Sequence, residues 1–164
     1  MAMHATFAER VAFGRPLEVH EDTRVHLAPR PKTALIGRIL LASIFLVSGF
    51  AKLTNTAETA GHMSSVGIPA PELLAVVAGV AELAGALAIL FGCLTRIGAL
   101  GLIVFMIPTT LLFHGFWAVE GAAQKTEMIN FLKNLTIIGG LSLLVAHGPG
   151  PYSIDQKLRK QREV

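Results

Sequence analysis

Four apolar segments of about 20 residues constrain this chain more than any other feature. They cover about residues 34–53, 71–92, 97–117 and 127–147 of the 164. A helix rises 1.5 Å per residue, so about 20 residues cross the ~30 Å hydrocarbon core of a bilayer. Only 15% of the residues are charged, against about 25% in soluble domains. The sequence therefore predicts an all-α membrane protein, a bundle of four transmembrane helices.

The basic residues predict the orientation of this bundle. They gather before or at the start of the first segment, at residues 30–38, after the last segment, at 157–162, and in the 93–96 turn at Arg96. The 54–70 loop has no Lys or Arg, and the 118–126 loop has only Lys125. Cytoplasmic loops carry the excess of basic residues, so we predict that both termini and the 93–96 turn are cytoplasmic. The basic ends would also contact anionic lipid headgroups, whereas they lack the pattern of a nucleic-acid-binding module.

Three regions follow from this organisation. Residues 1–32 are polar and lack the apolar core of a signal peptide, so we expect a polar cytoplasmic extension. Residues 33–155 form the four-helix membrane domain, and residues 156–164 form a basic tail. The polar 54–70 loop could add a short interfacial helix.

Cys93 is the single cysteine, which excludes an enzyme that makes disulfides with its own cysteine pair.

Glu82 is the only charged residue between Glu72 and Arg96. An ionised carboxylate within a bilayer is costly and is usually paired, neutralised or hydrated. At 100° per residue, Glu82 shares one helix face with small residues only, namely Ala75, Ala78, Gly79, Gly85 and Ala86. Membrane helices approach closely along such faces, so Glu82 is predicted to point into the bundle.

The fourth segment places Asn130, Lys133 and Asn134 within about one turn of each other. Lys133 lies roughly 9 Å inward from Glu127, and Glu82 roughly 16 Å inward from Pro71. The two residues thus differ in depth by about 7 Å, which long side chains, helix tilt or one bridging water could span. The depths predict a Glu82–Lys133 pair, either as a structural clamp or as part of a functional site.

Further polar and aromatic residues fall in the same outer half of the membrane. His114 lies near the outward end of the third segment, followed by Phe116 and Trp117, and Lys52 ends the first. We predict one outward-opening pocket with Glu82, His114 and Lys133 as its reactive groups and with Lys52, Asn130, Asn134, Phe116 and Trp117 as ligand contacts. The alternatives stay open that Lys52 snorkels and that His114 is an interfacial histidine. His62 and His147 offer no axial partner, so no haem or metal site is predicted.

Residues 34–155 resemble the DoxX family of small four-helix membrane proteins. The resemblance is carried by Gly49-Phe50-Ala51-Lys52-Leu53, Ala81-Glu82-Leu83-Ala84-Gly85, Leu94-Thr95-Arg96, His114, Lys133-Asn134 and Gly148-Pro149-Gly150-Pro151-Tyr152-Ser153-Ile154-Asp155. It implies a four-helix bundle in a prokaryotic cytoplasmic membrane. Some members of this family are subunits of quinone-reducing oxidoreductases, and others are associated with oxidative-stress complexes.

Two hypotheses on function follow from the residues and this resemblance. In the first, the chain is a redox-complex subunit: His114 bonds a quinone carbonyl, Glu82 relays protons, and Lys133 tunes Glu82. Since the sequence has no cysteine pair, flavin motif or evident haem ligand, a protein partner would supply the electrons. In the second, the chain is a non-catalytic scaffold whose Glu–Lys pair fixes the helices, with a protein partner or a further copy bound to it. A lipid or solute carrier is a third alternative, with little support from four short helices.

Overall fold

The computed structural model describes residues 31–162, and their regular structure is helical throughout. In chain order, the elements are α2 (Pro31–Thr54), α3 (Thr56–Ser65), α4 (Pro71–Phe91), α5 (Thr95–Phe113), the 3-10 turn η1 (Phe116–Ala118), α6 (Gly121–His147) and α7 (Ile154–Arg162). Four helical spans are long and apolar enough to cross a membrane: 32–54, 71–91, 95–118 and 121–147. The predicted N-terminal extension lies outside the described residues, except for its last two, which begin α2.

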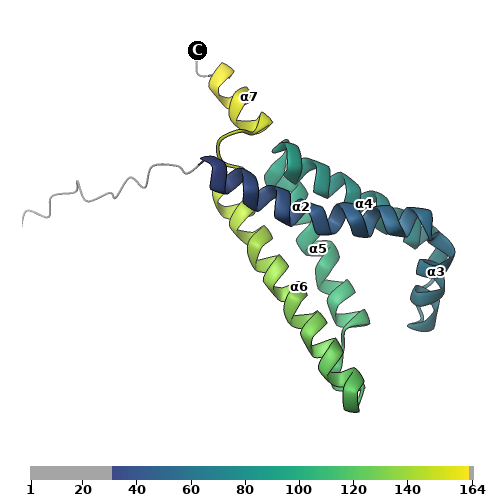
Figure 1. The fold of residues 1–164 in the computed structure, drawn as a ribbon. Coiled ribbons are helices and arrows are strands. Elements are labelled where there is room, and N and C mark those ends of the chain that lie inside the picture. The colour runs from purple at the N-terminus through teal and green to yellow at the C-terminus, as the bar shows by residue number, and fades with distance from the viewer. Residues whose placement is uncertain (1–30, 163–164) are drawn as a thin grey trace, which may run out of the picture.

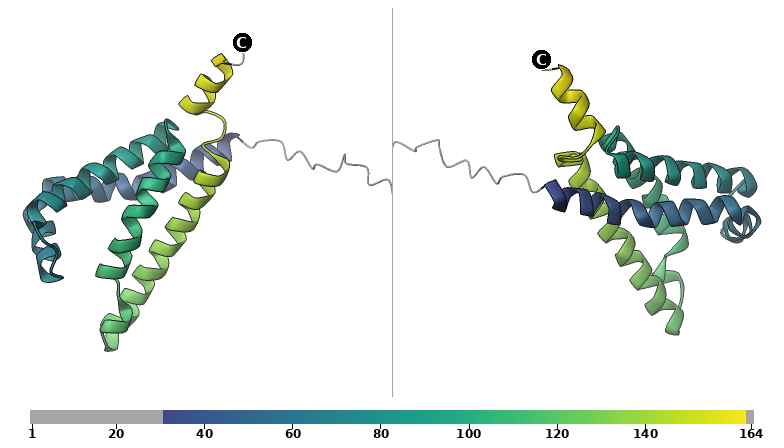
Figure 2. Two further views of the ribbon diagram at one scale, coloured as in Figure 1. Left: turned by 180° about the vertical axis from the view of Figure 1, so that it is seen from behind. Right: turned by 45° about the horizontal axis from the view of Figure 1, so that its top comes forward.

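The four long helices form two pairs that share one end (Figures 1 and 2). Helix α2 packs along α4, α5 packs along α6, and α4 joins the pairs through α5. The pairs meet where the 92–94 turn and α7 lie, and they diverge toward α3 and η1. We name these the inner and outer ends, after the predicted orientation. The short α3 is the helix expected in the 54–70 loop, and it packs on α4.

Glycine residues allow α2 and α4 to pack closely. A Cβ atom at Gly49 would lie 2.9 Å from the carbonyl oxygen of Gly79, and one at Gly79 would lie 2.8 Å from Leu53. Real Cβ atoms do not approach other atoms so closely, so neither position accepts a side chain unless the helices move apart. The predicted small-residue face of α4 is confirmed, since its members are all buried: Ala75, Ala78, Gly79, Glu82, Gly85 and Ala86.

Helix α6 begins earlier than the sequence predicted. We expected its start near residue 127, where the apolar run begins, but it starts at Gly121. Ala122, Ala123, Gln124 and Lys125 are good helix formers, so the helix extends outward beyond its apolar part. This extension makes Lys133 the 13th of 27 helical residues, close to the middle of α6.

The inner end is fixed by the segment that follows α6. Asp155 accepts hydrogen bonds from the backbone N–H groups of Leu94 (2.8 Å) and Thr95 (3.0 Å) and from the Thr95 hydroxyl (2.9 Å), so it caps α5. Burial alone would raise the pKa of Asp155, but these hydrogen bonds outweigh it and hold the pKa below its usual range. The buried Arg38 of α2 donates to the carbonyl oxygen of Tyr152 at 2.7 Å. The backbone N–H of Asp155 also donates to the carbonyl oxygen of Gly92, the C-cap of α4, at 2.8 Å. The 148–155 segment thus ties α2, α4 and α5 together.

Candidate functional site

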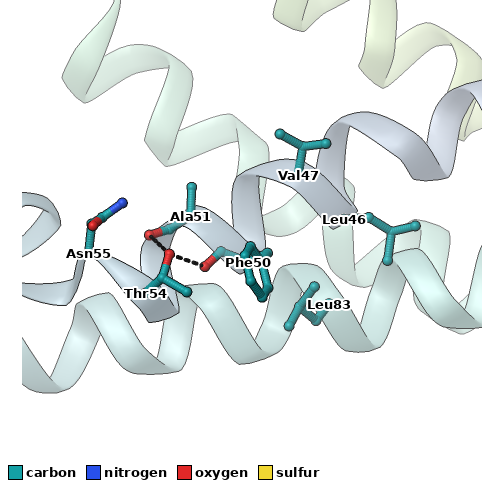
Figure 3. A pocket seen from close by; sticks show the side chains of 7 residues that line it. All are labelled: Leu46, Val47, Phe50, Ala51, Thr54, Asn55 and Leu83. Carbon is teal, nitrogen blue, oxygen red and sulfur yellow. Dashed lines mark hydrogen bonds between the residues drawn. The ribbon is translucent and has the colours of Figure 1, made fainter.

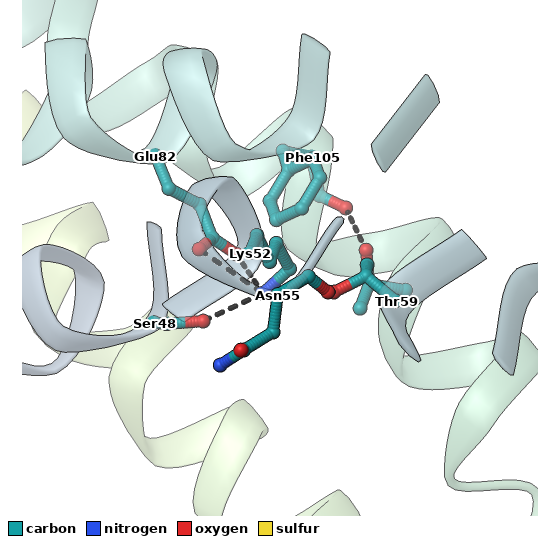
Figure 4. Close-up of polar contacts among 7 residues, drawn as sticks. Ser48, Lys52, Asn55, Thr59, Glu82 and Phe105 are labelled. Atoms are coloured by element: carbon teal, nitrogen blue, oxygen red, sulfur yellow. Dashed lines mark hydrogen bonds and ion pairs between the residues drawn. The ribbon is translucent and has the colours of Figure 1, made fainter. Parts of the chain in front are cut away.

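Glu82 is buried between α4 and α2, where it pairs with Lys52. The Nζ atom of Lys52 lies 3.1 Å from each carboxylate oxygen of Glu82 and donates a 2.6 Å hydrogen bond to the Ser48 hydroxyl. Figure 4 shows the three side chains converging. The Glu82 side chain is 5% exposed and that of Lys52 is 22% exposed. Each carboxylate oxygen therefore has a cationic partner, as a buried charge requires.

The prediction that Lys133 pairs with Glu82 is wrong, because Lys52 occupies that place. Lys52 follows Gly49 by one turn, so the close α2–α4 contact brings its stem beside Glu82. Helix α6, by contrast, packs mainly on α5. Lys133 is exposed and makes no hydrogen bond or ion pair within residues 31–162. The depth estimate was insufficient because depth along a helix does not say which helices are neighbours.

A second polar cluster joins α5 to α6 at the outer end. His114 follows the last residue of α5, and its Nδ1 lies 2.8 Å from Oε2 of Glu127 on α6. Asn130, one turn further along α6, donates to the same oxygen at 3.5 Å. The side chains of His114 and Glu127 are 27% and 30% exposed, so both remain accessible. Glu127 was not among the predicted site residues; its i,i+3 spacing to Asn130 was the available signal in the sequence.

Aromatic rings pack beside this cluster. Phe116 and Trp117 of η1 and Phe131 of α6 make three mutual edge-to-face contacts, with centroids 5.1, 5.5 and 5.8 Å apart. His62 of α3 stacks on Phe113, with centroids 5.9 Å apart. The rings of η1 and α6 form an apolar surface next to a histidine–carboxylate pair. Such a combination suits a flat ring that carries polar groups.

The predicted single pocket therefore divides into two clusters. Lys52, Glu82 and Ser48 lie on the α2–α4 pair, whereas His114, Glu127 and Asn130 lie on the α5–α6 pair. No hydrogen bond or ion pair in the described part of the chain joins them. Asn134, predicted as a ligand contact, donates to the hydroxyl of buried Thr110 at 3.0 Å and so ties α6 to α5.

A shallow groove of about 600 Å³ lies between α2 and α4 on the surface of this helix pair. Figure 3 shows its lining: Leu46, Val47, Phe50, Ala51, Thr54, Asn55 and Leu83. Its walls are mostly apolar, and it contains none of the predicted site residues. Within residues 31–162, no group of three His, Cys, Asp or Glu side chains is placed to hold a metal ion.

Comparison with known proteins identifies the family of this chain. The family model described as DoxX matches residues 33–115. The inner membrane protein YphA of Escherichia coli (strain K12) is 38% identical over 130 residues, which are 79% of this chain and 93% of YphA. The inner membrane protein YqjF of the same organism is 43% identical over 127 residues, 77% of this chain and 92% of YqjF.

A third relative is the uncharacterized membrane protein Rv3486 of Mycobacterium tuberculosis (strain ATCC 25618 / H37Rv). It is 28% identical over 148 residues, which are 82% of this chain and 86% of that protein. No solved structure matches the chain. Four apolar helices, the matched family model and the two inner membrane relatives lead to one conclusion. This chain is an integral membrane protein that belongs to the DoxX family.

Proposed function

We propose that the chain is a membrane subunit of a redox complex and holds a quinone head beside His114 at the outer end. The observation that carries this proposal is the accessible His114–Glu127 pair, with Nδ1 and Oε2 2.8 Å apart, next to the rings of Phe116, Trp117 and Phe131. A quinone head is a flat ring with two carbonyl oxygens. It needs a surface to stack on and a hydrogen-bonding group at a carbonyl.

The chemistry follows from how His114 is held. Reduction of a quinone to a quinol takes two electrons and two protons; in this proposal a partner subunit supplies the electrons. Glu127 holds the Nδ1–H of His114, which leaves Nε2 free to face a ligand. A protonated His114 would donate from Nε2 to the quinone carbonyl and pass that proton to the reduced oxygen. The second proton, and the one that restores His114, would come from water at the outer end. The carboxylate of Glu127 would stabilise the imidazolium before the transfer.

In this proposal Glu82 holds two helices together and does not relay protons. Both its oxygens are engaged by Lys52, and its side chain is 5% exposed. A buried carboxylate with both oxygens paired to one lysine is better suited to hold α2 against α4. This observation favours the second candidate function for that cluster, a structural clamp inside a membrane scaffold.

The quinone site can be tested by photo-crosslinking with an azido-quinone in native-lipid particles. We expect label on η1 and the first half of α6, competition by excess unlabelled quinone, and loss of label in His114→Gln. His147→Gln is the matched control, because His147 is an exposed histidine at the opposite end of α6. The contradicting result is label that excess quinone does not displace and that persists in His114→Gln. The scaffold would then be the better account.

The orientation and the membrane are also part of the proposal. The names of the E. coli relatives place them in the inner membrane. We propose the same membrane for this chain, with both termini cytoplasmic and with His114 on the opposite side, as the basic residues predict.

A further inference from the structure

Lys133 occupies an unusual position for a charged residue. It lies twelve residues after Gly121, about 18 Å along α6 at 1.5 Å per residue, and about 21 Å before His147. It is therefore near the middle of α6, about 9 Å inward from Glu127, where the apolar part of this helix begins. Its side chain is exposed on the surface of the bundle, and it has no hydrogen-bonding or ionic partner within residues 31–162.

The surface around Lys133 is uncovered because α2 and α6 diverge. Gly140 lies two turns along α6 on the same face as Lys133 and packs against Leu41 of α2, since a Cβ at Gly140 would lie 3.0 Å from Leu41. Outward from this contact the two helices separate (Figures 1 and 2). The residues beside Lys133 on α6, namely Ile129, Leu132 and Thr136, are exposed.

We infer that the α6 face around Lys133 binds a transmembrane helix of another protein, and that this helix carries an Asp or Glu at the depth of Lys133. An unpaired ammonium group in the bilayer interior requires an anionic or polar partner. Lipid headgroups lie at the membrane surface, and a lysine stem covers only part of the roughly 9 Å between Lys133 and the outer end of the apolar part of α6. A carboxylate on a neighbouring helix can form an ion pair with Lys133 at the same depth.

A second copy of this chain does not supply that carboxylate. The acidic residues within the four spans are Glu72, Glu82 and Glu127. Glu72 lies in the first turn of α4, at its outer end. Glu82 is buried on Lys52, and Glu127 is bound to His114. The charge complementary to Lys133 must therefore come from a different protein.

The neighbouring surface allows a helix to approach. Thr136 lies one turn further along α6 than Lys133, about 60° around the helix from it, and it is exposed. A small residue at this position permits close backbone contact between membrane helices. The approach would place the partner helix alongside the middle of α6, where an interhelical ion pair is shielded from water.

The test uses the full chain in phosphatidylcholine vesicles with a polyleucine helix that carries one Glu at its centre. Energy transfer between fluorophores on the two molecules reports their association, and a polyleucine helix with a central Gln is the reference. We expect the Glu helix to associate about tenfold more tightly than the Gln helix. Lys133→Gln should remove this preference. Lys125→Gln, which changes an exposed lysine at the outer end of α6, should keep it.

Three results would overturn the inference. The first is equal association of the Glu and Gln helices with the unaltered chain. The second is a preference for Glu that persists in Lys133→Gln. The third is self-association of the labelled chain that Lys133→Gln abolishes, which would make a second copy the occupant.

Discussion

Lys52 and Glu82 form a partly buried ion pair across the α2–α4 interface, with Nζ 3.1 Å from both carboxylate oxygens. The pair lies one turn from the point where Gly49 and Gly79 bring the two backbones together. Close packing and charge pairing thus depend on each other: the glycines set the separation, and the ion pair neutralises the two charges that this separation buries.

Glu82→Gln should destabilise the bundle. The substitution leaves the Lys52 ammonium in a largely apolar interface, and removing one member of a buried pair costs up to about 3–5 kcal/mol, less here because Lys52 keeps some exposure. The loss of stability is measured by unfolding the detergent-solubilised protein and following its helix content by circular dichroism. The double variant Lys52→Met/Glu82→Leu should recover most of it; a double variant less stable than Glu82→Gln alone would contradict the clamp.

Gly49→Ala should separate α2 from α4. The new methyl group would lie 2.9 Å from both the Gly79 carbonyl oxygen and Leu83, and such overpacking costs about 1–3 kcal/mol. Gly101→Ala on α5 is the matched control, because nothing lies within 4 Å of a Cβ there. In a helix that control should be neutral or stabilising by about 0.5–1 kcal/mol. Equal effects of the two substitutions on thermal stability would argue against close packing at Gly49.

Asp155→Asn should show a pH-dependent loss of stability. Because the folded state lowers the pKa of Asp155, the carboxylate adds stability that is complete above the unfolded pKa of about 3.9 and is lost as pH falls through the folded value. At neutral pH the variant should lose about 1 kcal/mol, the usual worth of a helix cap. The difference from the unaltered chain should shrink below about pH 4. A difference that stays constant into acid would mean that Asp155 acts without its charge.

Cysteine labelling should report opposite sides for the two ends of the bundle. In a Cys93→Ala background, Ser64→Cys on α3 should react with a membrane-impermeant maleimide added to intact cells. Gln161→Cys on α7 should react only after the membrane is opened, because the basic residues of α7 retain it on the cytoplasmic side. The reverse pattern would invert the orientation and place His114 on the cytoplasmic side.

The sequence predicted the helices and the inward face of α4 because both depend on local patterns of apolar and small residues. It did not predict the partner of Glu82, since that depends on which helices are neighbours. The start of α6 at Gly121 was missed because Ala122–Lys125 are helix-forming but not apolar enough to extend the hydrophobic segment. Glu127 was not predicted as a site residue, and Lys52 was predicted as a ligand contact but not as the partner of Glu82. A charged residue near a helix end is typical of an interfacial anchor, and only the fold shows which residue it contacts.

Fluorescence of Trp117 tests the proposed quinone site most directly. Trp117 is the single tryptophan and lies in the aromatic cluster beside His114. Titration of the purified chain with a short-chain quinone should quench its emission along a saturable curve. His114→Gln should weaken apparent binding by about tenfold, since a hydrogen bond to a charged group contributes about 1.5–3 kcal/mol, whereas His147→Gln should not change it. Quenching that rises linearly without saturation, and equally in all three proteins, would contradict a quinone site at His114.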